Sequence, residues 1–197
     1  MQKKTRTLTL VAVFSALSFI IMFFSINIPF FPHFLRLDIS DVPAMFLGFL
    51  LGPIYGILVV LGKNILHLFI SSNLGIGELA NFIIGSSLVG VSSLFYYKKN
   101  YNLLSSYFWG VLVMGITAII VNLIVIIPLY DKVLALPISK IISLTSKVNP
   151  FVNNIFTYLF LTILPFNLIK GMVITIITNL LYKKLNPISK HKLQGGF

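Results

Sequence analysis

Hydrophobic residues in this chain form long, continuous runs instead of alternating with polar residues. A helix needs about 20 consecutive apolar residues to cross the hydrocarbon core of a membrane. Continuous runs favour helices over the alternating strands of a membrane β-barrel. The pattern therefore predicts an all-α integral membrane protein with six transmembrane helices, at about residues 7–26, 43–51, 54–70, 78–97, 103–127 and 162–182.

The breaks between these helices fall at residues that disfavour helical backbone. Gly52 and Pro53 form a strong breaker pair between the second and third helices. Gly48 and Gly56 repeat the small-residue spacing around that pair, which predicts a tight hairpin. We expect the fifth helix to stop at Pro128, where a more polar connection begins.

The last apolar stretch, residues 151–182, is too long for one straight span. Its first part, to about Leu161, is predicted to approach the membrane from outside, and the sixth helix surrounds Pro165. Residues 183–197 form a basic, polar tail that we expect to be mobile. No second domain, internal repeat or low-complexity linker is evident, so residues 1–197 are predicted to form a single membrane domain.

The composition agrees with a chain embedded in lipid. Of the 197 residues, 57% are hydrophobic and 10% are charged, and the mean hydropathy is +0.99. A soluble domain of this size carries roughly a quarter charged residues, so lipid must replace much of the polar surface. The chain has no cysteine, which excludes a disulfide framework and thiolate chemistry.

The net charge of +11 does not indicate a nucleic-acid partner, because the basic residues form no single basic face. They stand at the ends of apolar runs, where lysine and arginine set membrane topology. Nine lie in segments assigned to the inside and four in outer loops, which predicts a multi-pass protein of the cell membrane with both termini in the cytoplasm. The inner set is Lys3, Lys4, Arg6, Lys98, Lys99, Lys183, Lys184, Lys190 and Lys192, and the outer set is Arg36, Lys132, Lys140 and Lys147.

Three ionisable residues lie inside apolar helices or at a helix mouth: Lys63, Glu78 and Lys170. Such groups are costly in a membrane and are functional candidates by default. Asn81 shares a helical face with Glu78, and Asn167 shares one with Lys170, because each pair is three residues apart. Lysine offers donors, glutamate acceptors and asparagine both. This set suits a flat heterocycle with carbonyl, imide and hydroxyl groups better than a simple ion.

Each of these residues also has a structural explanation. Glu78 is placed where the dipole of a helix N-terminus stabilises a negative charge. Lys170 has a stem long enough to reach the membrane interface, and it is also able to pair with Glu78. Lys63, with Asn64 and His67, forms a second polar face, which we interpret mainly as an anchor for the third helix.

The fifth predicted helix contains a lone polar residue, Asn122. In lipid, an amide of this kind often forms a hydrogen bond to a neighbouring helix. The sequence is equally consistent with that role and with contact to a ligand.

Asp38 and Asp41 are the only closely spaced carboxylates, and such a pair is a feature of aspartyl-type membrane enzymes. A catalytic dyad requires two carboxylates that converge within a few ångströms. These two lie in one loop beside Arg36, and we interpret Ser40 or Asp41 as the cap of the helix that begins at Pro43. The sequence shows no nucleophile elbow, phosphate-binding loop or metal-ligand spacing. We therefore predict neither a catalytic site nor a metal site.

Ala12 and Ala16 are four residues apart near the start of the first helix. Small residues at this spacing let two helices approach closely in lipid. The partner is either another membrane subunit or a helix of the same chain.

Five motifs, in order along the chain, resemble the riboflavin-specific S components of energy-coupling-factor (ECF) vitamin transporters. Each motif alone is unremarkable, but together they cover nearly the whole chain. They are Leu37-Asp38-Ile39-Ser40-Asp41-Val42-Pro43-Ala44, Lys63-Asn64-Ile65-Leu66-His67-Leu68, Gly77-Glu78-Leu79-Ala80-Asn81-Phe82, Pro128-Leu129-Tyr130, and Leu164-Pro165-Phe166-Asn167-Leu168-Ile169-Lys170-Gly171.

The resemblance implies a six-helix subunit that captures riboflavin near the outer leaflet. It implies that Glu78, Asn167 and Lys170 form hydrogen bonds to the vitamin. Asn81 and Asn122 are carried over as weaker contacts. Riboflavin is then the transported ligand, and no cofactor is expected.

The resemblance also implies partners. The spacing of Ala12 and Ala16 matches the alanine motif by which S components of this class contact the membrane coupling subunit, which two ATP-binding subunits drive. Two other functions remain open: capture of a different heterocyclic vitamin, or a small membrane enzyme or structural protein that binds no vitamin.

Overall fold

The computed structural model describes residues 2–99 and 101–194, and almost all of the regular structure there is helical. A two-stranded ribbon and three short π-helical segments (η) complete it. In chain order the elements are α1 (Gln2–Met22), β1 (Ile26–Asn27), β2 (Arg36–Leu37), α2 (Asp41–Leu51), α3 (Pro53–Leu68), α4 (Ile76–Ser93), η1 (Leu94–Lys98), α5 (Leu103–Val121), η2 (Asn122–Ile126), α6 (Ile127–Leu134), α7 (Ile138–Ser146), α8 (Ile155–Tyr158), η3 (Leu159–Ile163) and α9 (Leu164–Gln194).

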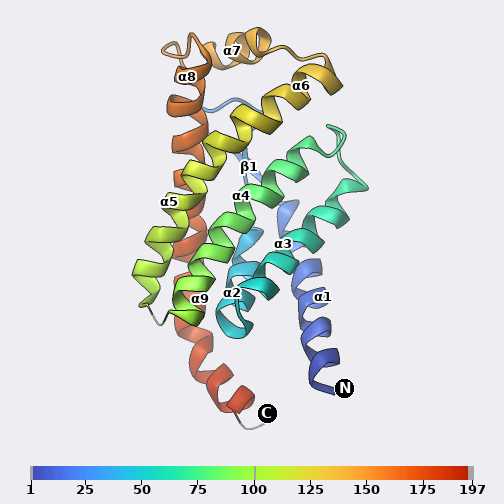
Figure 1. Cartoon of the computed structure of the whole chain (residues 1–197), viewed down its shortest axis with the longest axis vertical. Coiled ribbons are helices and arrows are strands. Elements are labelled where there is room, and N and C mark those ends of the chain that lie inside the picture. Colours follow the sequence, from blue (N-terminus) through green and yellow to red (C-terminus); the bar gives the residue numbers. More distant parts are fainter. Residues whose placement is uncertain (1, 100, 195–197) are drawn as a thin grey trace.

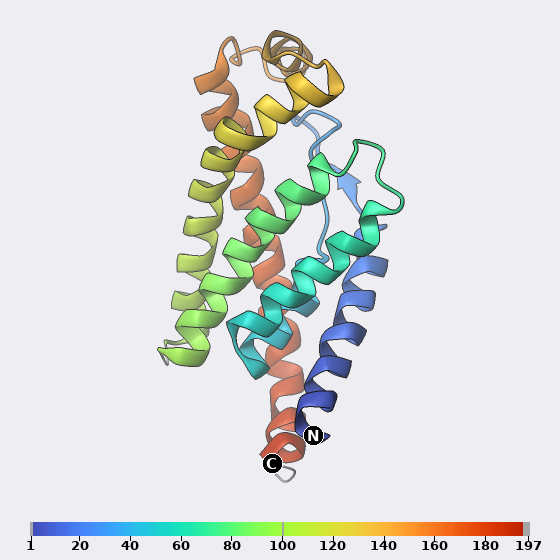
Figure 2. The ribbon, with the colours of Figure 1, turned by 45° about the vertical axis from the view of Figure 1, so that its right-hand side comes forward.

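The long helices form one elongated bundle (Figure 1). Helix α4 packs between α3 and α5, α3 also packs against α1, and α5 packs against α9. The short helix α2 lies in the middle, in contact with α1, α3, α4 and α9, and most of its residues are buried. Both ends of the chain lie at one end of the bundle, and α6, α7 and α8 lie at the other (Figures 1 and 2).

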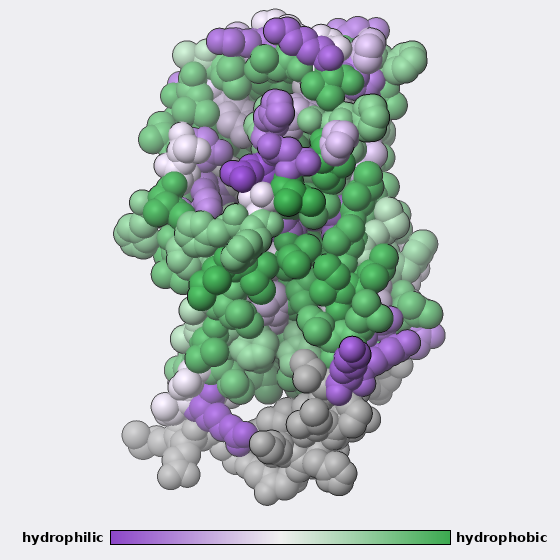
Figure 3. All heavy atoms as spheres, turned by 180° about the vertical axis from the view of Figure 1, so that it is seen from behind, coloured by the Kyte–Doolittle hydropathy of each residue, from purple (hydrophilic) through white to green (hydrophobic). Residues whose placement is uncertain are grey.

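The surface of the bundle matches a membrane environment. In the part of the chain that the structure describes, four helical stretches are long and apolar enough to cross a membrane: Lys4–Met22, Ile76–Lys98, Leu103–Leu134 and Ile155–Lys184. Helices α2 and α3 are apolar but shorter. Figure 3 shows a broad hydrophobic band between hydrophilic residues at the two ends. The predicted all-helical membrane architecture is therefore confirmed.

Two helical stretches continue through prolines: Pro128, where the sequence predicted a stop, and Pro165, which the predicted sixth helix already contained. Helix α5 runs through η2 into α6 past Pro128, and the last helix begins at Ile155 and runs through η3 past Pro165. Proline removes one backbone donor and clashes with the carbonyl one turn earlier. A π-helical turn ends two residues before each proline, and its wider spacing relieves this clash. The prediction of a stop at Pro128 was wrong for this reason. The predicted start of the last helix at about residue 162 was also wrong, because the chain is already helical from Ile155.

The first and last helices also differ from the predicted bounds. Helix α1 ends at Met22 instead of residue 26, because Ile26 and Asn27 pair with Leu37 and Arg36 in the antiparallel ribbon. The last helix extends to Gln194, through most of the predicted mobile tail, and residues 195–197 lie outside the described part of the chain.

The predicted hairpin between α2 and α3 is confirmed. Gly52 connects the two helices with φ of 110°, a conformation that residues with a side chain rarely adopt. A Cβ on Gly56 would lie 3.1 Å from the Cα of Gly48, so the two helices touch through bare backbone. This close approach packs α2 tightly against α3 in the middle of the bundle.

Candidate binding site

A cavity of about 380 Å³ opens in the half of the bundle that lies away from the chain termini. Its volume falls within the range of about 300–1,000 Å³ that is typical of small-molecule pockets. Its wall includes residues of the loop before α2 and of the helical elements α1, α3, α4, α5, η2, α6, α8, η3 and α9. All five predicted ligand-binding residues line this cavity: Glu78, Asn81, Asn122, Asn167 and Lys170.

Glu78 is held in the first turn of α4 by residues that precede this helix. The helix begins directly after Gly75, whose φ of 83° turns the chain. One carboxylate oxygen, Oε1, lies 2.7 Å from Nδ1 of His67, and the other accepts a hydrogen bond of 2.9 Å from Oγ of Ser71. Glu78 is therefore positioned by specific contacts as well as by the dipole of α4.

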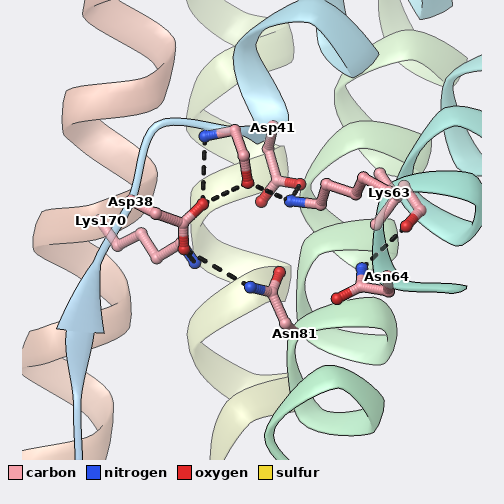
Figure 4. A network of polar contacts seen from close by, with 8 residues as sticks. Asp38, Asp41, Lys63, Asn64, Asn81 and Lys170 are labelled. Carbon is pink, nitrogen blue, oxygen red and sulfur yellow. Dashed lines mark hydrogen bonds and ion pairs between the residues drawn. The ribbon is translucent and has the colours of Figure 1, made fainter. Parts of the chain in front are cut away.

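Lys170 projects from α9 to Asp38, and its Nζ donates a hydrogen bond of 2.7 Å to Oδ2 (Figure 4). Both side chains are buried. Lys170 therefore neither reaches the membrane interface nor pairs with Glu78, the two structural roles considered from the sequence. Its counter-ion comes from the loop that leads into α2.

Asp38 accepts hydrogen bonds on both carboxylate oxygens. Oδ1 accepts from the backbone N–H of Ser40 at 3.1 Å and from the Ser40 hydroxyl. Oδ2 accepts from Lys170 and, at 3.4 Å, from Nδ2 of Asn81. Burial alone would raise the pKa of Asp38, but the charges of Lys170 and Lys63 and the hydrogen bonds from Lys170 and Ser40 hold it well below its usual range.

A second buried ion pair lies behind the first. Nζ of Lys63 on α3 lies 2.5 Å from Oδ1 of Asp41 and donates a 2.5 Å hydrogen bond to Oγ of Ser40. Lys63 and Asp41 are completely buried. Lys63 is absent from the cavity wall, whereas His67, one turn later, is part of it. The interpretation of this polar face as an anchor therefore describes Lys63 but not His67.

Ser40 occupies the N-cap position of α2, one of the two positions predicted, although the helix begins at Asp41 and not at Pro43. The side chain of Ser40 nevertheless accepts no hydrogen bond from the helix. Instead the Ser40 hydroxyl links Lys63 to Asp38, and Asp41 pairs with Lys63. The buried ammonium of Lys63 competes more strongly for these side chains than backbone N–H groups do, because charged hydrogen bonds are the stronger ones.

The cavity residues Asn122 and Asn167 make hydrogen bonds within their own helices. Nδ2 of Asn122 donates to the carbonyl of Ala118 at 2.8 Å, and Nδ2 of Asn167 donates to the carbonyl of Ile163 at 2.9 Å. The bond of Asn122 is therefore not the interhelical bond considered from the sequence. The second N–H and the carbonyl oxygen of each amide can serve a molecule in the cavity.

Apolar side chains fill the spaces between these polar groups. Phe166 lines the cavity and contacts Phe31 in an edge-to-face arrangement, with ring centroids 5.4 Å apart. The other large hydrophobic residues of the wall include Phe23, Phe34, Ile84, Met114, Tyr130, Tyr158 and Ile163. A mostly apolar wall with a few fixed polar groups is the usual composition of a site for a small organic molecule.

Asp38 and His67 are cavity residues that the sequence interpretation did not assign to the site. A signal for Asp38 was present, because two lysines in apolar helices require acidic partners and the chain has only four acidic residues. Which acid serves which lysine depends on the path of the loop before α2, and no spacing rule reveals that path.

Ala12 and Ala16 lie away from the cavity, on the exposed side of α1. The opposite side carries Ser15 and Ser18, which are buried. Ser15 fits against Gly62 of α3, where a Cβ would lie 2.5 Å from its hydroxyl. Helix α1 therefore packs into its own bundle through these serines and through Leu10, Val11 and Phe14, whereas the two alanines are exposed.

The fold and the cavity together define a membrane-embedded protein that binds a small molecule. The model of the family described as "ECF transporter, substrate-specific component" matches residues 6–182, and the chain therefore belongs to this family. It is a family of transporter subunits and not of enzymes.

Curated relatives are similar over most of their length. The chain is 35% identical to a riboflavin transporter RibU of Staphylococcus aureus, over 94% of this chain and 92% of the relative. It is 32% identical to the riboflavin transporter FmnP of Bacillus subtilis, over 93% of this chain and 94% of the relative. A solved structure, described as the S component of a bacterial ECF transporter, superposes with a TM-score of 0.75 at 32% identity, over 95% of this chain and 99% of that one.

Proposed function

We propose that this chain captures riboflavin outside the cell and delivers it to an ATP-driven ECF transporter. The observation that carries the proposal is the placement of Glu78, Asn81, Asn122, Asn167 and Lys170 in one cavity. Two relatives that match nearly the whole chain are named riboflavin transporters, which supports this choice of vitamin.

The polar groups of the cavity complement those of a flavin. Lys170 donates to ring carbonyl oxygens or ring nitrogens, and Glu78 accepts from hydroxyl or imide N–H groups. The amide oxygen of Asn81 is buried and has no hydrogen-bond partner among the described residues. A buried acceptor of this kind is costly unless it is paired, and a donor on the bound vitamin supplies the partner.

Six membrane-crossing segments complete the proposed architecture, with the shorter helices α2 and α3 added to the four long stretches. Both termini then face the cytoplasm. The chain ends lie together at the end of the bundle away from α6 and α7 (Figure 1). Three basic residues of the predicted outer set, Lys132, Lys140 and Lys147, are exposed in or next to α6 and α7, at the other end. The cavity lies in the half of the bundle away from the chain termini, so in this orientation it faces outward, where the vitamin is captured.

The proposed partners supply the energy, because the sequence contains no nucleotide-binding motif. We assign the exposed face around Ala12 and Ala16 to the contact with the membrane coupling subunit, which associates with two ATP-binding subunits. Val13 and Leu17 flank the alanines and are 56% and 45% exposed. This apolar face with two small residues allows a close helix crossing in lipid.

The absorption spectrum of the protein purified from its cell membrane tests this function without any mutation. A bound flavin absorbs visible light and makes the preparation yellow, whereas heterocyclic vitamins such as thiamine and biotin absorb no visible light. A preparation that yields a colourless vitamin on denaturation would assign the cavity to a different substrate.

A further inference from the structure

Asp38 holds Lys170 at the cavity wall with all of its hydrogen-bonding capacity committed. Its Oδ2 accepts from Lys170 and Asn81, and its Oδ1 accepts twice from Ser40. These partners belong to α9, α4 and the loop before α2. A carboxylate anchored from three directions has little freedom to move, so the ammonium paired with it is fixed as well.

The orientation of the Ser40 hydroxyl is determined by chemistry. Lys63 can only donate hydrogen bonds, so the Ser40 oxygen accepts from Nζ of Lys63 and its O–H must point to Asp38. Lys63 is in turn paired with Asp41. A continuous chain of charged hydrogen bonds therefore runs from Lys170 at the cavity wall to the buried contact between α2 and α3 (Figure 4).

We propose that Asp38 is a positioning residue, which sets the ligand affinity of the cavity by fixing the ammonium of Lys170, and that Ser40 and Lys63 orient Asp38 from behind. The inference rests on the proposed function in one respect: it takes Lys170 as a ligand contact. Lys170 has three N–H donors, of which one serves Asp38. The other two are presented to the ligand in a fixed direction, and this removes the entropy cost of ordering a flexible side chain on binding.

A double-mutant cycle on riboflavin binding tests the proposal. The full-length protein in detergent is prepared as wild type, Asp38→Asn, Lys170→Gln and the double variant, and riboflavin affinity is measured by fluorescence quenching. Lys170→Gln and Asp38→Asn are each expected to weaken binding about tenfold. In the Lys170→Gln background, Asp38→Asn is expected to weaken riboflavin binding by less than about twofold further, because Asp38 then has no ammonium to position.

Asp131→Asn is the matched control, since Asp131 is exposed on α6 and lies outside the cavity. Its affinity is expected to equal that of the wild type. Thermal unfolding without ligand is recorded for every variant. If Asp38→Asn does not fold, Ser40→Ala replaces it in the same cycle. Ser40→Ala is expected to weaken riboflavin binding about threefold in the wild-type background and to have no effect in the Lys170→Gln background.

The outcomes separate this inference from the proposed function. Independent effects, in which Asp38→Asn weakens binding equally with and without Lys170, overturn the positioning role while riboflavin binding stands. An unchanged affinity in Lys170→Gln overturns both the positioning role and the placement of the ligand. Absence of riboflavin binding by the wild type overturns the proposed function itself.

Discussion

Nδ1 of His67, at the end of α3, lies 2.7 Å from Oε1 of Glu78, in the first turn of α4. Ser71, in the turn between the two helices, donates a hydrogen bond to the other oxygen of the same carboxylate. The turn therefore fixes the direction of Glu78, which remains part of the cavity wall. Like Lys170, Glu78 faces the cavity with a partner already in place.

Glu78→Gln is expected to weaken riboflavin binding about tenfold or more, because hydrogen bonds to charged groups contribute roughly 1.5–3 kcal/mol. The amide keeps the shape of the side chain but loses the charge and one acceptor. Fluorescence quenching of riboflavin by the purified protein measures the change. An affinity equal to that of the wild type would exclude Glu78 from the site.

Lys63→Ala is expected to lower stability more than affinity. Its removal leaves Asp41 buried without a counter-ion, at a cost of about 3–5 kcal/mol. Lys170→Ala is expected to weaken riboflavin binding more than Lys63→Ala does, because only Lys170 lines the cavity. Thermal unfolding and vitamin titration of the two variants make the comparison. A folded Lys63→Ala protein with the greater loss of affinity would place the ligand elsewhere.

Replacing both Ala12 and Ala16 with tryptophan is expected to separate binding from transport. Riboflavin binding by the isolated chain should be unchanged, because neither alanine packs into the bundle or reaches the cavity. Vitamin uptake and co-purification with the coupling subunit should fall, because the bulky side chains prevent a close helix crossing.

The control for this pair is Leu112→Trp with Ile116→Trp, which adds bulk at the same spacing on an exposed face of α5. The control is expected to keep both binding and co-purification. Loss of vitamin binding in the alanine variant would show that these residues support the fold of the chain itself.

The proposed topology is testable because the chain has no cysteine. Single variants Lys147→Cys and Lys98→Cys place one thiol at each end of the bundle, and both positions are exposed. In intact cells, a membrane-impermeant maleimide is expected to label position 147 and to reach position 98 only after permeabilisation. The reverse pattern would place the termini outside.

Continuous apolar runs predicted most of the helices within a few residues, because lipid requires every backbone group in a span to be paired internally. Pro128 was misinterpreted for a physical reason. A proline normally ends a helix, and the π-helical turn before Pro128 has no evident sequence signal.

The candidate site was likewise predicted only in part from the sequence. Lys170 and Glu78 were identified because an ionisable group in an apolar helix needs a functional or structural reason. Their partners Asp38 and His67 were not assigned to the site, because these contacts join residues that are 132 and 11 positions apart. Only the folded loop before α2 and the turn before α4 bring them together.

Titration of the purified, ligand-free protein with riboflavin tests the central claim most directly. The account predicts one vitamin bound per chain, without ATP or any other subunit, and with a dissociation constant in the nanomolar range, which corresponds to about 12 kcal/mol. Absence of binding below micromolar riboflavin, by calorimetry and by fluorescence quenching, would contradict it.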